Sequence, residues 1–267
     1  MNVRTRGIVF RQIQATGGRK MLLLFTEKYG KISTGTNLNE KSKNRSSLAI
    51  RPFTFGNYQI YEGKNYYNLD GAETIRSYYS IGEDLDRYMV SSYILELTEK
   101  IIPLEVPQPG IFRLLIDFMD EVSVRRGQYG TLVLAYEIRA LRMLGVFPQT
   151  GECSRCGRSD GLAYFSIPDG GMLCSSCFQK IRDAAEHPLI YHTKFDIVSV
   201  LNYLGSGSFS AFRDIALEQD TARRLQRIIR EYISYYLDVG HLKSESLLDA
   251  QIRKGKGGNG RPGNQGG

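Results

Sequence analysis

Four cysteines place the strongest constraint on how this chain of 267 residues can fold. Cys153, Cys156, Cys174 and Cys177 are all the cysteines in the sequence, and they form two C-x2-C pairs separated by seventeen residues. This spacing is typical of a structural zinc site, because each pair forms a tight knuckle with both thiolates on one side. Four thiolates complete a tetrahedral Zn²⁺ and leave no open position, so we predict one structural zinc ion.

Two glycine-containing segments favour this prediction. Gly157 follows the second cysteine, where a knuckle often needs a positive φ. Asp169-Gly170-Gly171 supplies a reversal that would bring the second cysteine pair back to the first. Two disulfides, a redox dithiol and an iron–sulfur cluster are the alternatives. Disulfides need an oxidising compartment, a redox dithiol ordinarily uses one C-x-x-C pair, and common iron–sulfur ligand runs are spaced differently, although spacing alone does not exclude them.

The distribution of apolar residues indicates a cytoplasmic protein. No segment approaches the ~20 consecutive apolar residues that span a bilayer. The first ten residues, MNVRTRGIVF, lack the apolar run of a signal peptide. A cytoplasmic location also suits cysteines that serve as metal ligands.

Positive charge is concentrated at the start of the chain. Residues 1–56 carry eleven Lys and Arg against two acidic residues, whereas residues 57–138 carry seven against thirteen. Residues 139–267 carry seventeen against thirteen. Such a local excess of cations attracts phosphate backbones, so we predict a nucleic-acid-binding N-terminal region, with a merely solvated basic face as the alternative.

Short β segments dominate the first ~80 residues. Closing them into a barrel removes exposed strand edges, so an OB-fold is the economical prediction for residues 1–79. A polar, basic loop is expected over residues 37–47. The predicted strand segments are Val3–Gln14, Met21–Thr26, Ile32–Gly35, Leu48–Phe55, Asn57–Tyr61 and Tyr66–Asp70.

A helical periodicity begins at Ser80. Ser80-x-x-Glu83 matches a capping box and predicts a helix that continues to about Lys100. Pro103, Pro107 and Pro109 are then expected to break it. Further helices are predicted at Gly110–Val124, Thr131–Leu144, Ser199–Leu204, Ser208–Leu217 and Thr221–Leu237.

These elements predict an α+β multidomain protein. An N-terminal OB-fold β-barrel at 1–79 is followed by a mostly α-helical domain at 80–250. A zinc module with all four cysteines is inserted into the helical domain at 150–178. The Gly-rich tail at 251–267 has nothing to bury and is predicted to be disordered.

Cations and aromatic residues alternate in the predicted barrel, as in proteins that bind single strands through phosphate contacts and base stacking. The predicted DNA-binding cations are Arg4, Arg6, Arg11, Arg19, Lys20, Lys28, Lys31, Lys41, Lys43, Arg45 and Arg51. The aromatic candidates are Phe10, Phe25, Tyr29, Phe53, Phe55, Tyr58 and Tyr61. Aromatic residues in strands more often belong to the core, so the cations carry the prediction.

A second basic strip lies in the last predicted helix. Arg223, Arg227 and Arg230 are spaced i, i+4 and i+7, opposite the apolar face, and either bind phosphate or form a solvated face. We include Arg223 and Arg227 among the DNA-binding candidates. Arg125-Arg126 and the pair Arg139/Arg142 are weaker candidates of the same kind.

The sequence indicates no enzyme. It contains no nucleotide-binding loop and no recognised hydrolase or metalloprotease motif. His187, His192 and His241 have no visible Ser or Cys nucleophile partner, and all four cysteines are assigned to the metal.

The order of these parts resembles the bacterial recombination mediator family RecO. The resemblance spans about residues 1–250 and rests on four stretches. One loop departs from the pattern usual in this family, in which Arg or Lys closely follows a glycine. The stretches are Phe25–Lys31, Arg51-Pro52-Phe53, Tyr136–Gly145 and His241–Ser244. The departing loop has five residues between Gly35 and its first cation, Lys41.

The resemblance implies a DNA repair protein that is not an enzyme, binds single- and double-stranded DNA, and anneals complementary strands. It also implies partnership with RecR and with the acidic tail of single-stranded DNA-binding protein, so that RecA can replace that protein on the strand. A nucleoid-associated protein of the cytoplasm is therefore expected. Two other classes remain open: an RNA-binding OB-fold and zinc protein of translation or transcription, and a zinc-stabilised scaffold whose basic face only confers solubility.

Overall fold

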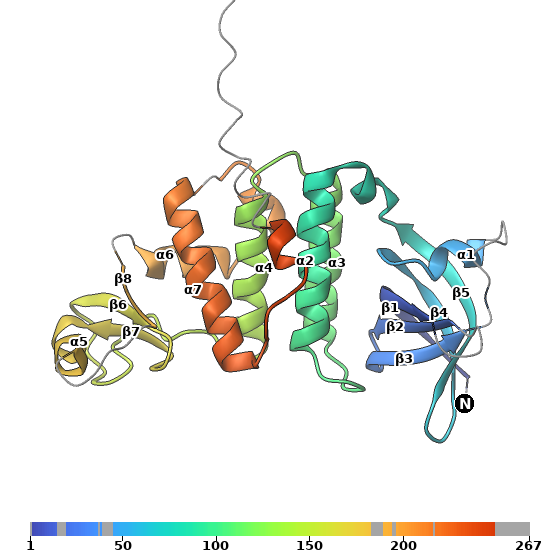
Figure 1. Cartoon of the computed structure of the whole chain (residues 1–267), viewed down its shortest axis with the longest axis horizontal. Helices are drawn as coiled ribbons and strands as arrows, with labels where there is room; N and C mark the ends of the chain where they lie inside the picture. Colours follow the sequence, from blue (N-terminus) through green and yellow to red (C-terminus); the bar gives the residue numbers. More distant parts are fainter. Residues whose placement is uncertain are drawn as a thin grey trace, which may run out of the picture.

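A barrel, a group of helices and a small cysteine-containing unit lie in a row in the computed structural model (Figure 1). The order of the three parts in space follows their order in the chain, except that the C-terminal helix returns to the other helices. The structure describes residues 2–14, 20–36, 38, 45–182, 189–193, 196–215 and 217–248. The predicted disordered tail, 251–267, lies outside the described residues.

The N-terminal part is a closed five-stranded barrel with the strand order β1-β2-β3-β5-β4. Strands β3 and β5 pair in parallel, and the other neighbours are antiparallel. Alternate residues point inward, so fully buried Leu22, Leu24, Ile32, Tyr58 and Ile60 fill the interior. The predicted OB-fold is confirmed. Its strands are β1 (Asn2–Gln14), β2 (Lys20–Thr26), β3 (Gly30–Thr36), β4 (Thr54–Glu62) and β5 (Tyr67–Ser77).

The strand predicted at Leu48–Phe55 is wrong. The structure has helix α1 (Arg45–Ala49), a turn, and then β4 from Thr54. Ala49 and Ile50 are fully buried, so these apolar residues pack into the core from a helix and a turn and do not pair in a strand. Pro52 has no N–H group to donate to a strand ladder, and Phe53 has a φ of 61°, which no β-strand accepts.

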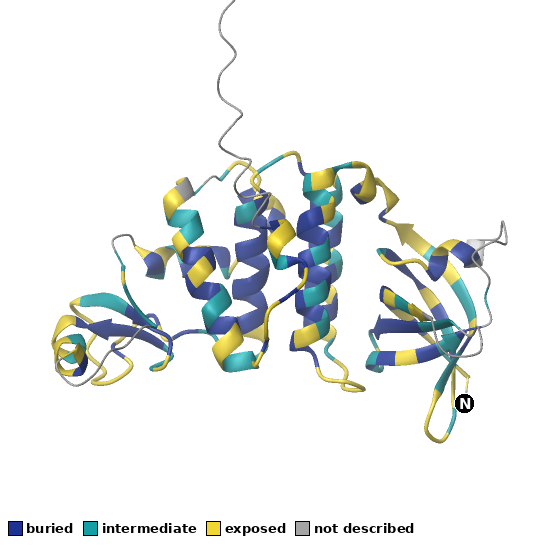
Figure 2. Ribbon diagram, in the orientation of Figure 1, coloured by how far each residue is buried: buried dark blue, intermediate teal, exposed yellow. Residues whose placement is uncertain are grey.

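Five longer α-helices, two 3₁₀ turns and a helical segment at 245–248 make up the helical part among the residues that the structure describes, and buried residues run through its centre (Figure 2). Pro109 opens a helix and does not break one, because the first helical position needs no N–H donor. The helix predicted at Ser208–Leu217 is wrong, because only the 3₁₀ turn η2 (Phe209–Phe212) forms there. The helices are α2 (Leu85–Ile101), α3 (Pro109–Val124), α4 (Tyr129–Met143), α6 (Ile197–Leu204) and α7 (Gln219–Leu237). None of the described helices is long and apolar enough to cross a membrane.

The helix start predicted at Ser80 is also wrong. Tyr79–Glu83 forms the 3₁₀ turn η1, which buried Ile81 fixes against the core. Asp84 is the N-cap of α2, and its carboxylate accepts a hydrogen bond of 3.0 Å from the backbone N–H of Arg87. Capping therefore occurs four residues later than the sequence motif indicates.

This correction predicts different effects for two neighbouring substitutions. Asp84→Ala should lower the free energy of unfolding by about 1 kcal/mol, because one N–H of the first turn loses its partner. Ser80→Ala should change it by less than about 0.5 kcal/mol, because Ser80 is exposed in a turn. Chemical denaturation followed by far-UV circular dichroism measures both values. Equal losses in the two variants would contradict the assignment of Asp84 as the cap.

The barrel and the helices share one hydrophobic core. Phe112 of α3 packs edge-on against Phe25, at 5.2 Å between ring centroids, and also contacts Phe55. Phe10 stacks on Phe25 at 5.7 Å. The N–H of Glu105 donates to the carbonyl of Lys31 at 2.9 Å. The outer side of β2 is therefore covered by the helices.

Candidate metal centre and nucleic-acid surface

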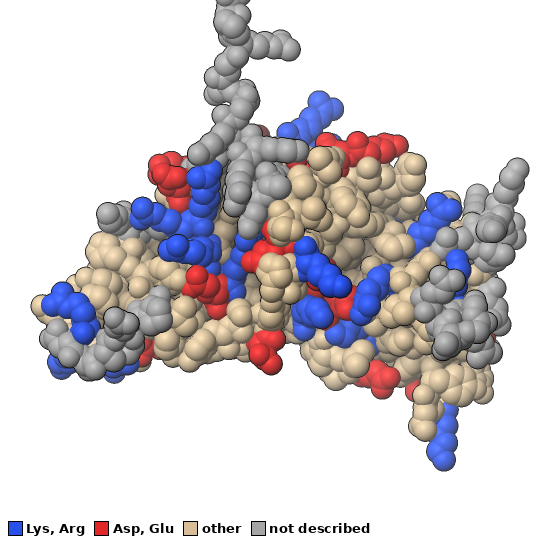
Figure 3. Space-filling view, in the orientation of Figure 1, with Lys and Arg blue, Asp and Glu red and all other residues tan. Residues whose placement is uncertain are grey.

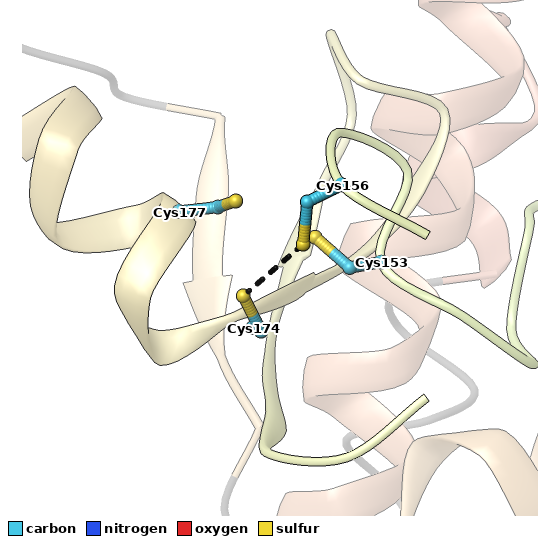
Figure 4. Close-up of side chains that lie close together, drawn as sticks. All are labelled: Cys153, Cys156, Cys174 and Cys177. Atoms are coloured by element: carbon cyan, nitrogen blue, oxygen red, sulfur yellow. Dashed lines mark hydrogen bonds between the residues drawn. The ribbon is translucent and has the colours of Figure 1, made fainter. Parts of the chain in front are cut away.

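The four cysteines meet in one cluster (Figure 4). Their Sγ atoms all lie within 4.8 Å of one another, and those of Cys156 and Cys174 are 3.8 Å apart. Cys153 and Cys156 come from the turn before β6 (Leu162–Ser166), Cys174 ends β7 (Gly171–Cys174), and Cys177 lies in the first turn of α5 (Ser175–Arg182). With β8 (Ile190–His192), these elements form the cysteine unit, 150–182 and 189–193.

Backbone geometry explains why the pairs converge. Gly157 has the predicted positive φ, 71°, and its N–H donates to the carbonyl of Cys153 at 2.9 Å, which closes the first knuckle. Gly170 has a φ of 73° in the turn that joins β6 to β7, as predicted for the chain reversal. The N–H of Ser154 donates to the carbonyl of Met172, which ties the first knuckle to β7.

The cluster fits a tetrahedral metal ion. Zn–S bonds of about 2.3 Å at tetrahedral angles place sulfur atoms about 3.8 Å apart, the separation of Cys156 and Cys174. Burial would raise the pKa of the Cys153 thiol, but backbone hydrogen bonds from Cys174, Arg155 and Cys156 outweigh it and lower this pKa to about 6. Side-chain hydrogen bonding with Cys156 and burial raise the pKa of the Cys177 thiol to about 12, so the convergence of the four Sγ atoms, and not these pKa values, indicates that the cysteines could hold a metal ion.

The cysteine unit is anchored to α7. Tyr236 donates its hydroxyl hydrogen bond to the carbonyl of Ile167 at 2.9 Å, and Phe165 contacts the ring of Tyr232. The sheet of the unit continues through β8, beyond the predicted end of the zinc module at residue 178. The unit that contains the cysteine cluster thus lies against α7.

The barrel cations fall into two groups. Arg6 forms a bidentate ion pair with Glu27 at 2.6 and 2.8 Å, and Arg11 pairs with Glu99 of α2. Lys31 donates to the backbone carbonyl of Glu99. These three cations hold the barrel and the helices in place as well as carrying charge.

Arg4, Lys28 and Arg51 are exposed and form no ion pair among the described residues. Lys20 is half-buried. Arg19, Lys41 and Lys43 lie outside the described residues, and of Arg45 only the backbone is described.

A groove of about 490 Å³ crosses the outer face of the barrel. Arg4, Arg6 and Lys28 line it, together with the carboxylates of Glu27 and Glu73. Because Arg6 and Glu27 pair with each other, Arg4 and Lys28 remain to meet an anion there. We call this the outer groove.

Most aromatic candidates belong to the core. Phe10, Phe25, Phe55 and Tyr58 are buried, so these rings offer no face to a base. The hydroxyl of Tyr58 donates to the carbonyl of Ala49 at 2.7 Å, as a core tyrosine does. Of the remaining three, Tyr61 is exposed, and Tyr29 and Phe53 are half-buried.

The second basic strip is only partly free. Arg223 lies 3.8 Å from Asp220, and the guanidinium of Arg227 sits 5.3 Å from the ring centre of Tyr191. Arg224 is exposed, whereas Arg230 is largely buried and contacts Glu245. Figure 3 shows Lys and Arg side chains over α7, and a mixture of both charges between the barrel and the helices.

Two of the weaker candidates are structural arginines. Arg125 is buried in an ion pair with Glu121, and Arg139 donates to the carbonyls of Leu204 and Ser206 at 3.2 and 3.0 Å. Neither can contact a phosphate, because folding places both guanidinium groups inside the protein. Arg126 and Arg142 are exposed.

One buried acid was missed in the sequence. Glu137 is fully buried, accepts a hydrogen bond of 2.6 Å from the hydroxyl of Tyr93, and lies in the field of Arg230. Burial raises the pKa of Glu137 to about 7, although the charge of Arg230 and the hydrogen bond from Tyr93 both lower it. Both partners are distant in the sequence, so no local pattern signalled them. His192 and His241 are exposed, and His187 lies outside the described residues.

Comparison with known proteins gives a match over both main parts. Residues 1–78 match the family profile described as "Recombination protein O N terminal". Residues 82–246 match the profile described as "Recombination protein O C terminal". The two matches meet within η1, between the barrel and α2.

Three relatives, each named "DNA repair protein RecO", illustrate the similarity. The chain is 29% identical to the protein of Thermoanaerobacter sp. over 247 residues, which cover 92% of this chain and 97% of the relative. It is 28% identical to the Bacillus velezensis protein, with 93% and 94% covered. Identity to the Listeria innocua protein is 27%, with 91% and 92% covered.

Proposed function

The chain belongs to the RecO family of DNA repair proteins, and from this premise we propose that it is a recombination mediator. It binds single- and double-stranded DNA and anneals complementary strands. Together with RecR, it helps RecA to replace single-stranded DNA-binding protein, whose acidic tail it contacts. The observation that carries the proposal is the basic OB barrel of this chain. Residues 1–56, which form most of the barrel, contain eleven Lys and Arg and two acidic residues.

Annealing requires two repelling phosphate backbones to come together while the base edges stay free. A basic surface that contacts phosphates, and reads no sequence, meets both requirements. Arg4 and Lys28 in the outer groove, and Arg223 and Arg227 on α7, provide such contacts at two distant places on the molecule. The proposed activity needs no chemical step, so the protein is proposed not to be an enzyme.

The proposed metal is one structural Zn²⁺ held by Cys153, Cys156, Cys174 and Cys177. When bound, it supplies four bonds that close the cysteine unit, and no reactive water. The role of the zinc ion would then be to stabilise the cysteine unit, which includes β8 and packs against α7. The proposed location is the cytoplasm, in association with the nucleoid.

Strand annealing tests the proposed function. Complementary labelled oligonucleotides are coated with single-stranded DNA-binding protein and mixed with and without this protein. We expect faster annealing that needs no added nucleotide. Binding without annealing, or a preference for RNA of the same sequence, would favour an RNA-binding protein and overturn the proposal.

Charge reversal in the outer groove should weaken binding of every DNA sequence alike. We expect Arg4→Glu combined with Lys28→Glu to lower affinity by roughly tenfold or more at low salt, because two phosphate contacts become repulsive. The slope of log affinity against log salt should fall by about one to two units. Fluorescence anisotropy with two unrelated oligonucleotides measures both.

Arg126→Glu is the matched control, since Arg126 is an exposed cation beyond the end of α3 and outside the outer groove. It should leave the affinity within about twofold. A loss confined to one of the two sequences would contradict backbone binding at this groove.

A further inference from the structure

A second groove lies at the junction of the barrel and the helices. It has a volume of about 510 Å³, within the range of ligand sites. Its floor includes one face of α2, from Tyr88 to Lys100, a distance of about 18 Å along the helix axis. Strand β1, the turn before β4 and the turn at Lys243–Ser244 complete the walls. We call it the junction groove.

Aromatic side chains line one end. Phe53 and Tyr88 face each other with ring centroids 5.8 Å apart and an interplanar angle of 52°. Tyr88 is 42% exposed, and Phe53 is half-buried. The rings thus present apolar surface to an open groove.

Phe53 is held in a conformation that a bulky residue rarely adopts. Its φ of 61° lies in the left-handed region, and its carbonyl accepts a hydrogen bond from the N–H of Tyr78 at 3.2 Å. Such strain persists where the surrounding fold enforces it, and it clusters at binding sites. Here it directs Phe53 into the groove opposite Tyr88.

Cations line the other end and the rim. Arg11, Lys100 and Lys243 face two carboxylates, Glu96 and Glu99. Glu99 is paired with Arg11, and Glu96 accepts hydrogen bonds from the N–H groups of Lys243 and Ser244, the latter at 2.8 Å. No ion pair engages the ammonium groups of Lys100 and Lys243 among the described residues.

Lys31 lies close to these charges. Burial lowers its pKa, Glu99 opposes the shift, and the positive charges of Lys100 and Arg11 add to it. The groove therefore combines an anion-attracting rim with a pair of aromatic rings.

We propose that the junction groove holds an unpaired stretch of DNA strand, with a base against Phe53 and Tyr88 and its phosphates toward Lys100 and Lys243. This inference rests on the proposed DNA-binding function and adds a site for single strands. Single strands are bound by stacking platforms beside cations, whereas stacked bases of a duplex cannot enter between two domains. The helices cover the outer side of β2, but the junction beside β1 and the turn before β4 stays open next to Phe53 and Tyr88.

The test compares single-stranded and duplex DNA. We expect Tyr88→Ala to weaken binding of a labelled oligo(dT) about tenfold, because one base loses its stacking partner. Duplex affinity should stay within about twofold. Tyr88→Phe should bind as the wild type does, because the ring remains. Tyr79→Ala is the matched control, since Tyr79 is 71% exposed and lies outside the groove.

Photo-crosslinking gives a second readout that folding defects cannot mimic. An oligonucleotide with 5-iododeoxyuridine should crosslink to peptides that contain Tyr88 or Phe53. Lys100→Gln with Lys243→Gln should reduce the salt slope for oligo(dT) by about one to two units.

Each outcome separates this inference from the proposed function. Wild-type binding of oligo(dT) with no loss in Tyr88→Ala overturns the groove assignment alone. Absence of DNA binding by the wild type overturns both. A labelled acidic, apolar peptide gives the third outcome. If the peptide binds the wild type but not Tyr88→Ala, and no oligonucleotide displaces it, the groove docks a protein. That result also overturns the assignment to DNA.

Discussion

Removal of the proposed metal should unfold the cysteine unit and leave the barrel and the central helices folded. The unit has a small hydrophobic cluster of its own, in which the buried residues are Cys153, Leu173, Cys174 and Ile181. Its strands are five, four and three residues long. Phe165, Ile167 and Met172 pack in the main core with the helices, but so small a sheet still needs an additional constraint to offset the loss of chain entropy. In zinc-finger peptides, metal binding supplies about 10–16 kcal/mol, so its loss is the largest effect expected for this protein.

The measurement is hydrogen exchange by mass spectrometry before and after chelation. Peptides from residues 150–182 should lose protection, whereas peptides of β2 and α4 should keep it. Cys153→Ser and Cys174→Ser should reproduce the chelated state. Ser154→Ala is the matched control, because Ser154 is exposed within the same knuckle and its backbone hydrogen bond to Met172 is retained.

Elemental analysis identifies the metal. We expect one zinc per chain in the wild type and less than about a tenth of that in Cys153→Ser. Full protection of the cysteine unit in a metal-free sample would contradict a structural role. A visible absorption band with bound iron would replace zinc by an iron–sulfur cluster.

The cysteine cluster could be predicted because its signal is local. A C-x2-C pair and a following glycine define a knuckle within five residues, and the structure closes the knuckle through Gly157 as expected. The helices α3, α4 and α7 begin within two residues of their predicted starts for the same reason. By contrast, the capping box at Ser80 fails because buried Ile81 fixes a 3₁₀ turn there.

The candidate DNA surface could be predicted only in part, because its details depend on distant partners. Arg11 meets Glu99, which is 88 residues away in the sequence, and Phe25 meets Phe112. No window of sequence contains either pair. The junction groove was missed for the same reason, since Tyr88 and Lys243 come from opposite ends of the helical part.

Buried arginines show why the number of cations overstates the basic surface. Arg125 and Arg139 lie inside the fold, where carbonyl groups accept from both of them. Sequence spacing on a helix cannot distinguish a solvated arginine from one that binds the chain beyond the next loop. Three-dimensional contacts decide that question, and they place Arg125 in a buried ion pair with Glu121.

Glu121→Ala should destabilise the helical part by about 3–5 kcal/mol, because it leaves a buried guanidinium without its counter-ion. Glu121 is buried and accepts hydrogen bonds from Arg125 at 3.2 Å and from Arg213 at 2.7 Å. The side chain of Arg125 is only 1% exposed. Chemical denaturation followed by far-UV circular dichroism measures the loss.

The pH dependence of this loss has a definite sign. Burial would raise the pKa of Glu121, but the hydrogen bonds and charges of Arg213 and Arg125 outweigh it and lower this pKa. A carboxylate with a lowered pKa stabilises the fold above its ordinary pKa, and this stability is lost as pH falls through the folded-state pKa. The difference between the wild type and Glu121→Ala should therefore be full at about pH 7 and shrink in acid.

A double variant separates charge from hydrogen bonding. Glu121→Leu combined with Arg125→Met removes both buried charges, so it should cost less than Glu121→Leu alone. Arg126→Met, at the exposed neighbouring position, is the control for the arginine substitution. Arg125 also donates to the carbonyls of Gly127 and Phe212. If the double variant is as unstable as Glu121→Leu, these carbonyl bonds, and not the buried charge, hold the turn between α3 and α4 against η2.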